Sequence, residues 1–255
     1  MKKIPCLYNL DQLEEIQENI TTFFGDAVSH IVHEIKSEYV HTDIMVLAPQ
    51  GKKRTFVTFG MGARSMETPL GTKRCELVMA ATEKLDCPSE KLSIIAAELV
   101  RISKVPFEND TWFGGGHTIK ASKQFEEAFG YQAFAFRPPL YTASLSGLEE
   151  KIDFLVLVPI KEEERQWCID NHTLALVDQL NEAYEGAEFD VDFKRDLFLP
   201  PAMEEDEIDD YHMMSFFGVD KATYQKLLDC VDRAAENGVE ITKEWIENLV
   251  RDQLK

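Results

Sequence analysis

The fold class is decided by two apolar segments and the short turn between them: Tyr39-Val-His-Thr-Asp-Ile-Met-Val-Leu-Ala48, Gln50-Gly-Lys-Lys53 and Arg54-Thr-Phe-Val-Thr-Phe59. Both segments are rich in β-branched and aromatic residues, and Pro49 closes the first one, so each is predicted to be a strand. The turn is much shorter than a parallel crossover, which needs a dozen or more residues. The sequence therefore predicts an antiparallel strand pair.

Further elements are predicted on either side of this pair from the period of the apolar residues. The run Ile152–Ile160 is almost wholly apolar, as expected for a central strand buried on both faces. The overall prediction is an α+β fold, with a mixed, largely antiparallel β-sheet packed with helices and residues 26–184 in one compact unit. The other expected strands are Ser29–Ile35, Cys75–Thr82 and Tyr131–Phe136, and the expected helices are Asp11–Phe24 (N-cap Asp11), Ser89–Ser103 (N-cap Ser89), Phe125–Ala128 and Glu162–Tyr184.

The C-terminal part of the chain differs from the rest in charge. Between residues 188 and 210, ten acidic residues stand against Lys194 and Arg195, so this window carries −8 of the formal net charge of −19. Such a run predicts a solvated linker or an irregular crossing. We therefore expect a domain at 1–200, an acidic linker at 201–219 and a helical extension at 220–255. The helices Asp220–Ala235 and Thr242–Leu254 should form a C-terminal helical hairpin.

Composition and charge limit the possible functions. The chain has 255 residues, 44% of them hydrophobic, as in ordinary soluble globular proteins. A net charge of −19 argues against nucleic acid and anionic membranes as partners, because both repel an acidic protein. No apolar run reaches the length of a membrane span, and the N-terminus does not resemble an export signal. The five scattered cysteines form no CxxC pair, so we expect a cytoplasmic protein with reduced thiols.

Two glycine-rich patterns that could carry chemistry lack their required context. Gly60-Met-Gly-Ala-Arg-Ser65 resembles a degraded dinucleotide-binding loop, but Pro69 disfavours the helix that would receive the pyrophosphate. Gly114-Gly-Gly-His117 resembles an oxyanion loop, but the nucleophile elbow GxSxG is absent. We therefore predict no cofactor and no acyl-transfer chemistry. The glycines are expected to let the backbone pass close to another segment.

His41 and Asp43 are two residues apart on an expected strand, which places both side chains on one face. We expect a structural, hydrogen-bonded pair, with Asp43 accepting hydrogen bonds from the loop near Gly116 or His117. The alternative is a metal site formed by His41, Asp43 and His117, which would make the protein a metal-dependent hydrolase. No HExxH motif or repeated His/Asp spacing supports a metal.

Three blocks of the sequence, in order and at plausible spacing, resemble the signature of the suppressor-of-fused domain family. The similarity spans roughly residues 26–184. The blocks are Val40–Ile44 with Thr55–Met61, Met66 and Pro69; Asn109–Trp112 running into Gly116–Ile119; and Leu157–Ile160 followed by acidic residues and a helix.

This resemblance implies an α+β domain without known catalysis. Animal relatives restrain the zinc-finger transcription factors of Hedgehog signalling by gripping an extended peptide, and a second domain completes their peptide cleft. Bacterial relatives are often short and are proposed as immunity proteins. Because the last 45 or so residues here are expected to form a helical tail and to leave no room for such a second domain, we predict a bacterial-type, non-enzymatic, protein-binding domain. Its partner should be a protein, with neutralisation of a toxin domain as the most specific version.

The expected partner site lies in two segments where glycines are next to large side chains, namely the strand end and turn Gly60–Pro69 and the loop Trp112–His117. Glycine permits close approach of a partner backbone, and Met and Trp side chains supply adaptable apolar contact area. The alternative is that these residues only close the core beneath two loops. The predicted partner-binding residues are Gly60, Met61, Arg64, Met66, Trp112 and His117.

Overall fold

The computed structural model describes most of the chain, namely residues 5–25, 28–48, 54–69, 71–81, 89–217, 219, 221–237, 239, 242, 245 and 249. The chain divides into two compact units, Met1–Ala202 and Met203–Lys255, each with its own secondary structure.

The first unit is built around a nine-stranded sheet. Its strands are β1 (Val28–Val32), β2 (Asp43–Leu47), β3 (Arg54–Phe59), β4 (Met66–Thr68), β5 (Gly71–Ala81), β6 (Thr118–Lys120), β7 (Ala133–Phe136), β8 (Tyr141–Ala143) and β9 (Ile152–Ile160). Their order is β1-β2-β3-β5-β9-β7-β6, with β4 paired to β5 and β8 paired to β9. Among the pairs of described strands only β5 and β9 are parallel, and the isolated bridges Cys6–Val40 and Ala80–Asp190 are parallel as well. The predicted α+β fold with a mixed, largely antiparallel sheet is therefore confirmed.

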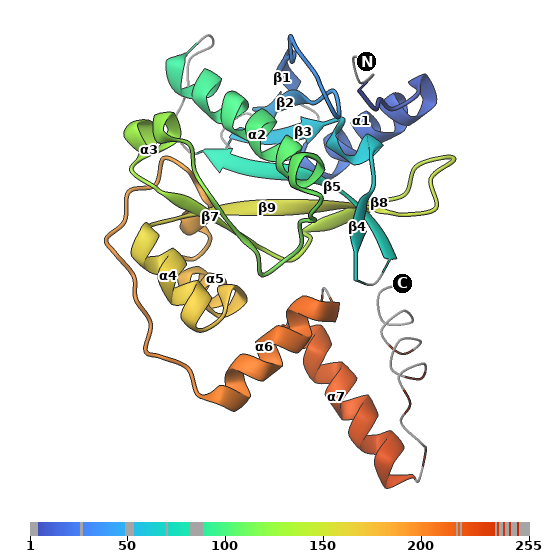
Figure 1. Cartoon of the computed structure of the whole chain (residues 1–255), viewed down its shortest axis with the longest axis vertical. Helices are drawn as coiled ribbons and strands as arrows, with labels where there is room; N and C mark the ends of the chain where they lie inside the picture. The colour runs from blue at the N-terminus through green and yellow to red at the C-terminus, as the bar shows by residue number, and fades with distance from the viewer. Residues whose placement is uncertain are drawn as a thin grey trace. The chain divides into compact units, whose positions relative to one another are not determined.

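Helices cover both faces of this sheet. In the first unit they are α1 (Leu10–Phe24), α2 (Glu90–Asn109), α3 (Lys123–Phe129), α4 (Glu162–Asp170) and α5 (Thr173–Tyr184), with short 3-10 turns at Met61–Ala63 and Ala187–Phe189. The long α2 lies across β2, β3 and β5, as Figure 1 shows. On the opposite face α1 packs against β3 and β8, and α4 and α5 pack against β7.

The central strand β9 connects the two cores. Its residues Leu155 and Leu157 point into the core under α2 and α3, whereas Phe154 and Val156 point into the core under α1. This alternation follows from the two-residue period of a strand. Every residue of β9 except Asp153 is buried, which confirms a central strand with both faces covered.

Several element boundaries differ from the sequence-based expectation, and capping explains two of them. Helix α1 is capped by Asn9, not Asp11: the Asn9 side chain accepts from the backbone N–H of Gln12, and the Gln12 side chain accepts from that of Asn9. The single helix expected at 162–184 is two helices, because the buried His172 caps α5 by accepting from the Leu174 N–H at 3.1 Å. A side chain that accepts a hydrogen bond from a backbone N–H in the first turn of a helix favours the start of a new helix there over continuation of the previous one.

The second unit contains α6 (Glu205–Phe217) and α7 (Lys221–Glu236). The range 201–219, for which the sequence predicts an irregular linker, thus contains a helix. Its first turn carries Glu205, Asp206 and Glu207, and carboxylates there are stabilised by the helix dipole. The helix α7 matches the first expected helix of the hairpin, whereas most of the second, Thr242–Leu254, lies outside the described residues. No helix among the described residues is long and apolar enough to cross a membrane.

Candidate functional site

The turn that follows β3 is organised around the buried carboxylate of Glu76 on β5. Glu76 has no exposed surface, and five groups donate hydrogen bonds to it. Three of them are consecutive backbone N–H groups, so the carboxylate fixes the path of the chain as β3 enters its 3-10 turn. The donors are the Tyr8 hydroxyl at 2.8 Å, the Thr58 hydroxyl at 2.6 Å, and the backbone N–H groups of Gly60 at 3.0 Å, Met61 at 3.3 Å and Gly62 at 3.0 Å.

This arrangement explains the glycines at positions 60 and 62. Gly60 has a φ of +127°, and a Cβ there would lie 2.1 Å from the carbonyl oxygen of His41. A Cβ at Gly62 would lie 2.4 Å from the Tyr8 hydroxyl oxygen and 3.3 Å from Glu76 Oε1. Real Cβ atoms do not approach so closely, so both positions need glycine. The Gly-Met-Gly segment is thus an internal anion cradle whose anion is Glu76.

Burial raises the pKa of Glu76 from 4.5 to about 7, although the hydrogen bonds from Thr58, Gly62 and Gly60 act in the opposite direction. Burial and the neighbouring Glu76 charge also raise the pKa of the Tyr8 phenol. The desolvation of the carboxylate is therefore the larger effect.

The predicted pair His41 and Asp43 lies together, but its partners differ from those expected. Asp43 Oδ2 accepts from His33 Nδ1 at 2.8 Å, whereas Oδ1 accepts the backbone N–H of Glu34 at 2.9 Å and lies 3.1 Å from His41 Nε2. Ser37 bonds to the other His41 ring nitrogen at 2.7 Å. The prediction that Asp43 binds the loop near Gly116 or His117 was wrong. The nearer loop 33–41 supplies the donors, because β1 ends at Val32 and β2 begins at Asp43.

His117 belongs to a different cluster from His41 and Asp43. Its ring lies 4.3 Å from that of Trp112, measured between centroids. Burial lowers the pKa of His117, a hydrogen bond with the Trp112 backbone raises it, and the positive charge of Lys73 lowers it. Among the described residues no three His, Cys, Asp or Glu side chains are grouped so as to hold a metal ion.

The predicted partner-binding residues divide into a buried and a half-buried set. Met61 is 1% exposed and Met66 is 3% exposed, and both lie in the core with α2. Gly60 is also buried. These residues therefore offer little area to a partner in this structure, and their role in it is to close the core beneath the turn.

Arg64, Trp112 and His117 remain half-buried and lie near the C-terminal end of α2. The Arg64 guanidinium stands 5.1 Å from the ring centroid of Phe107, in the last turn of α2. Asp110 then ends the helix in a left-handed conformation, with φ 48°, and the chain turns into the segment with Trp112. The structure thus brings Arg64 and Trp112 to the same end of one helix.

Two glycines shape this second segment. A Cβ at Gly114 would lie 2.6 Å from Cζ3 of Trp112, and a Cβ at Gly115 would lie 2.9 Å from the Pro138 Cα. Gly116 donates its N–H to the Phe136 carbonyl at 2.9 Å, which ties the segment to β7. The expectation that these glycines allow close approach of another segment is confirmed.

Sequence reasoning missed a second buried carboxylate, Glu164. Its carboxylate accepts hydrogen bonds from both terminal nitrogens of Arg195 and from the backbone N–H groups of Lys161 at 2.8 Å and Phe198 at 2.9 Å. Trp167 donates its indole N–H to the Pro200 carbonyl at 3.0 Å. The extended segment 193–200 is therefore held against α4. The only signal of this attachment in the sequence is the basic pair Lys194–Arg195 within an otherwise acidic run.

The start of the acidic window is buried as well. Glu188 is 1% exposed and Asp190 is 2% exposed, so the solvated linker expected from residue 188 onward was wrong for this part. The Val191 N–H donates to the Ala80 carbonyl at 2.9 Å, which joins the segment to the end of β5. Packing against the sheet, which charge patterning does not show, removes these side chains from solvent.

Comparisons with known proteins agree on one family. A family model described as "Suppressor of fused protein (SUFU)" matches residues 38–196. No curated protein matches the chain in sequence.

Solved structures of that family share the fold. A SUFU homologue from Neisseria gonorrhoeae FA 1090 has a TM-score of 0.56 and 13% identity, over 76% of this chain and 100% of that one. The Sufu–Fu complex gives a TM-score of 0.54 and 12% identity, over 70% and 86% of the two chains. Drosophila Suppressor of Fused gives a TM-score of 0.53 and 11% identity, over 72% of this chain and 51% of that one. At these identities the likeness concerns the fold alone.

Proposed function

The chain belongs to the suppressor of fused family, and on this premise we propose that it is a non-enzymatic domain that binds a protein partner. One relative of the same fold has been solved in a complex, Sufu–Fu. The most specific version of the proposal is an immunity protein that neutralises the toxin domain of a polymorphic toxin system.

The observation that carries the proposal is that two half-buried side chains, the indole of Trp112 and the guanidinium of Arg64, lie at the same end of α2. Trp and Arg are enriched among the residues that dominate binding energy at protein interfaces. The indole is supported by the His117 ring and by the close backbone of Gly114, so little side-chain entropy is lost on binding. We therefore propose Arg64, Trp112 and His117 as the residues that contact the partner. The buried residues Gly60, Met61 and Met66 would contribute indirectly, by holding the turn in place.

Capture of candidate toxin domains tests this proposal. Each domain is produced with the chain, and retention and dissociation constant are measured for the wild type and for Arg64→Ala combined with Trp112→Ala. Loss of the two side chains should weaken binding at least 100-fold, because truncation of central Trp or Arg anchors costs about 2 kcal/mol or more each. Survival of bacterial growth when the toxin domain is produced reports neutralisation.

A matched control is Arg54→Ala combined with Phe23→Ala, which removes the same types of side chain elsewhere on the first unit. Both double variants should unfold at nearly the same temperature as the wild type. If the Arg64/Trp112 variant unfolds early, these residues only close the core. If it folds and still captures the toxin domain, the partner site lies elsewhere.

A further inference from the structure

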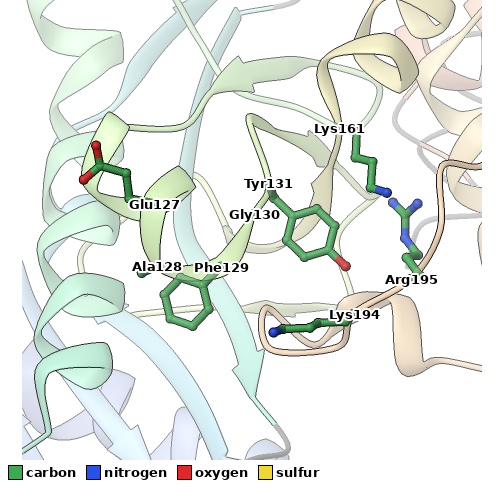
Figure 2. Close-up of a pocket in the computed structure, with 8 residues that line it drawn as sticks. All are labelled: Glu127, Ala128, Phe129, Gly130, Tyr131, Lys161, Lys194 and Arg195. Atoms are coloured by element: carbon green, nitrogen blue, oxygen red, sulfur yellow. The ribbon is translucent and has the colours of Figure 1, made fainter.

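A pocket of about 350 Å³ lies beside the buried Arg195, away from the residues proposed above for the partner. Its apolar wall comes from Phe129 and Tyr131, at the end of α3 and the start of the following segment. Figure 2 shows Lys161, Lys194 and Arg195 around Tyr131, with Glu127 on the opposite side. Three cations thus meet at one hollow in a chain whose net charge is −19.

The guanidinium of Arg195 leaves one donor unused. Both terminal nitrogens serve Glu164, and one of them also donates to the Pro159 carbonyl at 3.1 Å. Arg195 is only 8% exposed. Its Nε–H is buried and has no hydrogen-bond partner among the described residues. Because the Nε–H has almost no accessible surface, it does not face the pocket, and Arg195 contributes to the pocket only the charge that it shares with Glu164.

The positive charge of Arg195 is paired with Glu164, so the two lysines supply the unpaired positive charge of the pocket. No described residue pairs with the ammonium group of Lys161 or Lys194. The nearby carboxylates are engaged elsewhere, because Glu162 pairs with Lys120 and Arg165, and Glu127 lies 3.8 Å from Lys123. An anion in the pocket would therefore meet two positive charges with which no described residue pairs, on the side away from Glu127.

We propose that this pocket binds a small organic anion, with a carboxylate or phosphate group between the ammonium groups of Lys161 and Lys194, beside Arg195. The apolar part of the ligand would lie on Phe129 and Tyr131. Charge-assisted hydrogen bonds to the two lysines fix the anionic group, and the ring faces exclude water from it. The two anionic groups share this chemistry, so the test includes one probe of each kind.

Calorimetric titration of the full chain with benzoate, phenyl phosphate and benzyl alcohol tests the site. These probes share an aromatic body and differ in charge. At least one anion should bind in a salt-sensitive way and shift the NMR resonances of Gly130 and Tyr131, whereas benzyl alcohol should bind far more weakly. The tighter anion identifies the ligand class as carboxylate or phosphate.

Lys161→Gln combined with Lys194→Gln should weaken binding of the preferred anion about tenfold or more, without changing thermal unfolding of the ligand-free protein. The control Lys36→Gln combined with Lys151→Gln removes the same charge elsewhere and should leave binding unchanged. The proposal is overturned if neither anion binds, if benzyl alcohol binds as tightly as the anions, or if the control loses as much affinity as the pocket variant.

Discussion

Glu76 Oε1 accepts the backbone N–H of Gly62 at 3.0 Å, which joins a side chain on β5 to the turn after β3. The same oxygen also receives the Tyr8 hydroxyl, from the segment before α1. One carboxylate therefore holds together three parts of the chain that are distant in sequence. The Thr-Phe-Gly-Met block that resembles the family signature is, in this structure, the wall of a buried polar cluster.

Replacement of Gly62 tests how tightly this cluster is packed. In Gly62→Ala the new Cβ would lie 2.4 Å from the Tyr8 hydroxyl oxygen, so we expect a loss of roughly 1–3 kcal/mol in the free energy of unfolding. The measurement is chemical denaturation of the single variants, Tyr8→Phe and Gly62→Ala, and of the double variant.

Tyr8→Phe removes the closest atom, so the alanine should cost less in that background than in the wild type. Contacts at 3.2 Å with Ile152 and 3.3 Å with Glu76 would keep part of the cost. Additive effects of the two changes would show that Tyr8 and Gly62 are not coupled in this way.

The ionisation of Glu76 should make stability depend on pH. Because burial raises its pKa from 4.5 to about 7, the folded state holds this proton more tightly than the unfolded state. The resulting stability is fully present below pH 4.5 and is lost as pH rises through about 7. The wild type should therefore lose stability relative to Glu76→Gln over this window, by up to about 1.4 kcal/mol per pH unit.

Denaturation of both proteins at a series of pH values measures this difference, and the subtraction removes the contribution of other groups. Glutamine keeps the size of the side chain but does not titrate in this range. A difference that stays constant with pH, or grows in favour of the wild type as pH rises, would mean that the five hydrogen bonds outweigh burial.

Elements with a strong local pattern were predicted well. The bounds of β3 and β9 agree with the prediction, because β-branched and apolar residues fill most of Arg54–Phe59 and Ile152–Ile160. The N-cap at Ser89 was also correct, and its side chain accepts from the Leu92 N–H at 3.2 Å. In these cases the signal lies within a few residues of the element itself.

Features that depend on distant partners were not predicted. The burial of Met61 and Met66 comes from α2, which begins more than twenty residues later in the chain. Glu76 sits in a segment that was predicted as a strand, but its five donors come from Tyr8 and from residues 58–62. An acidic residue inside an apolar strand is the signal that could have indicated a buried carboxylate.

Removal of the Asp43 side chain should destabilise the loop 33–41. Asp43→Ala leaves the His33 ring and the Glu34 N–H without their acceptor, and we expect a loss of roughly 1–3 kcal/mol. His33→Ala removes only one of these bonds, from a side chain that is 72% exposed, so it should cost less. Denaturation measures both effects. Metal analysis of the wild type and Asp43→Ala separates this structural role from the hydrolase alternative, which requires a bound metal that the variant loses.

The last prediction concerns the extended segment 193–200. Arg195→Ala leaves the Glu164 carboxylate buried without its cation, and breaking a buried ion pair in this way costs about 3–5 kcal/mol. The segment should then be held less tightly against α4, because the ion pair is lost and only the bonds from the Phe198 N–H and the Trp167 indole remain of those described above. We expect faster amide hydrogen exchange and faster proteolysis within 193–200, whereas β2 and β3 keep their protection.

Glu164→Gln combined with Arg195→Met is the matched variant, because it removes both charges instead of one. It should be more stable than Arg195→Ala, since no uncompensated charge remains in the core. The Trp167 indole still donates to the Pro200 carbonyl in both variants, so one attachment of the segment is retained. If Arg195→Ala exchanged and unfolded like the wild type, the ion pair would not be what holds the segment in place.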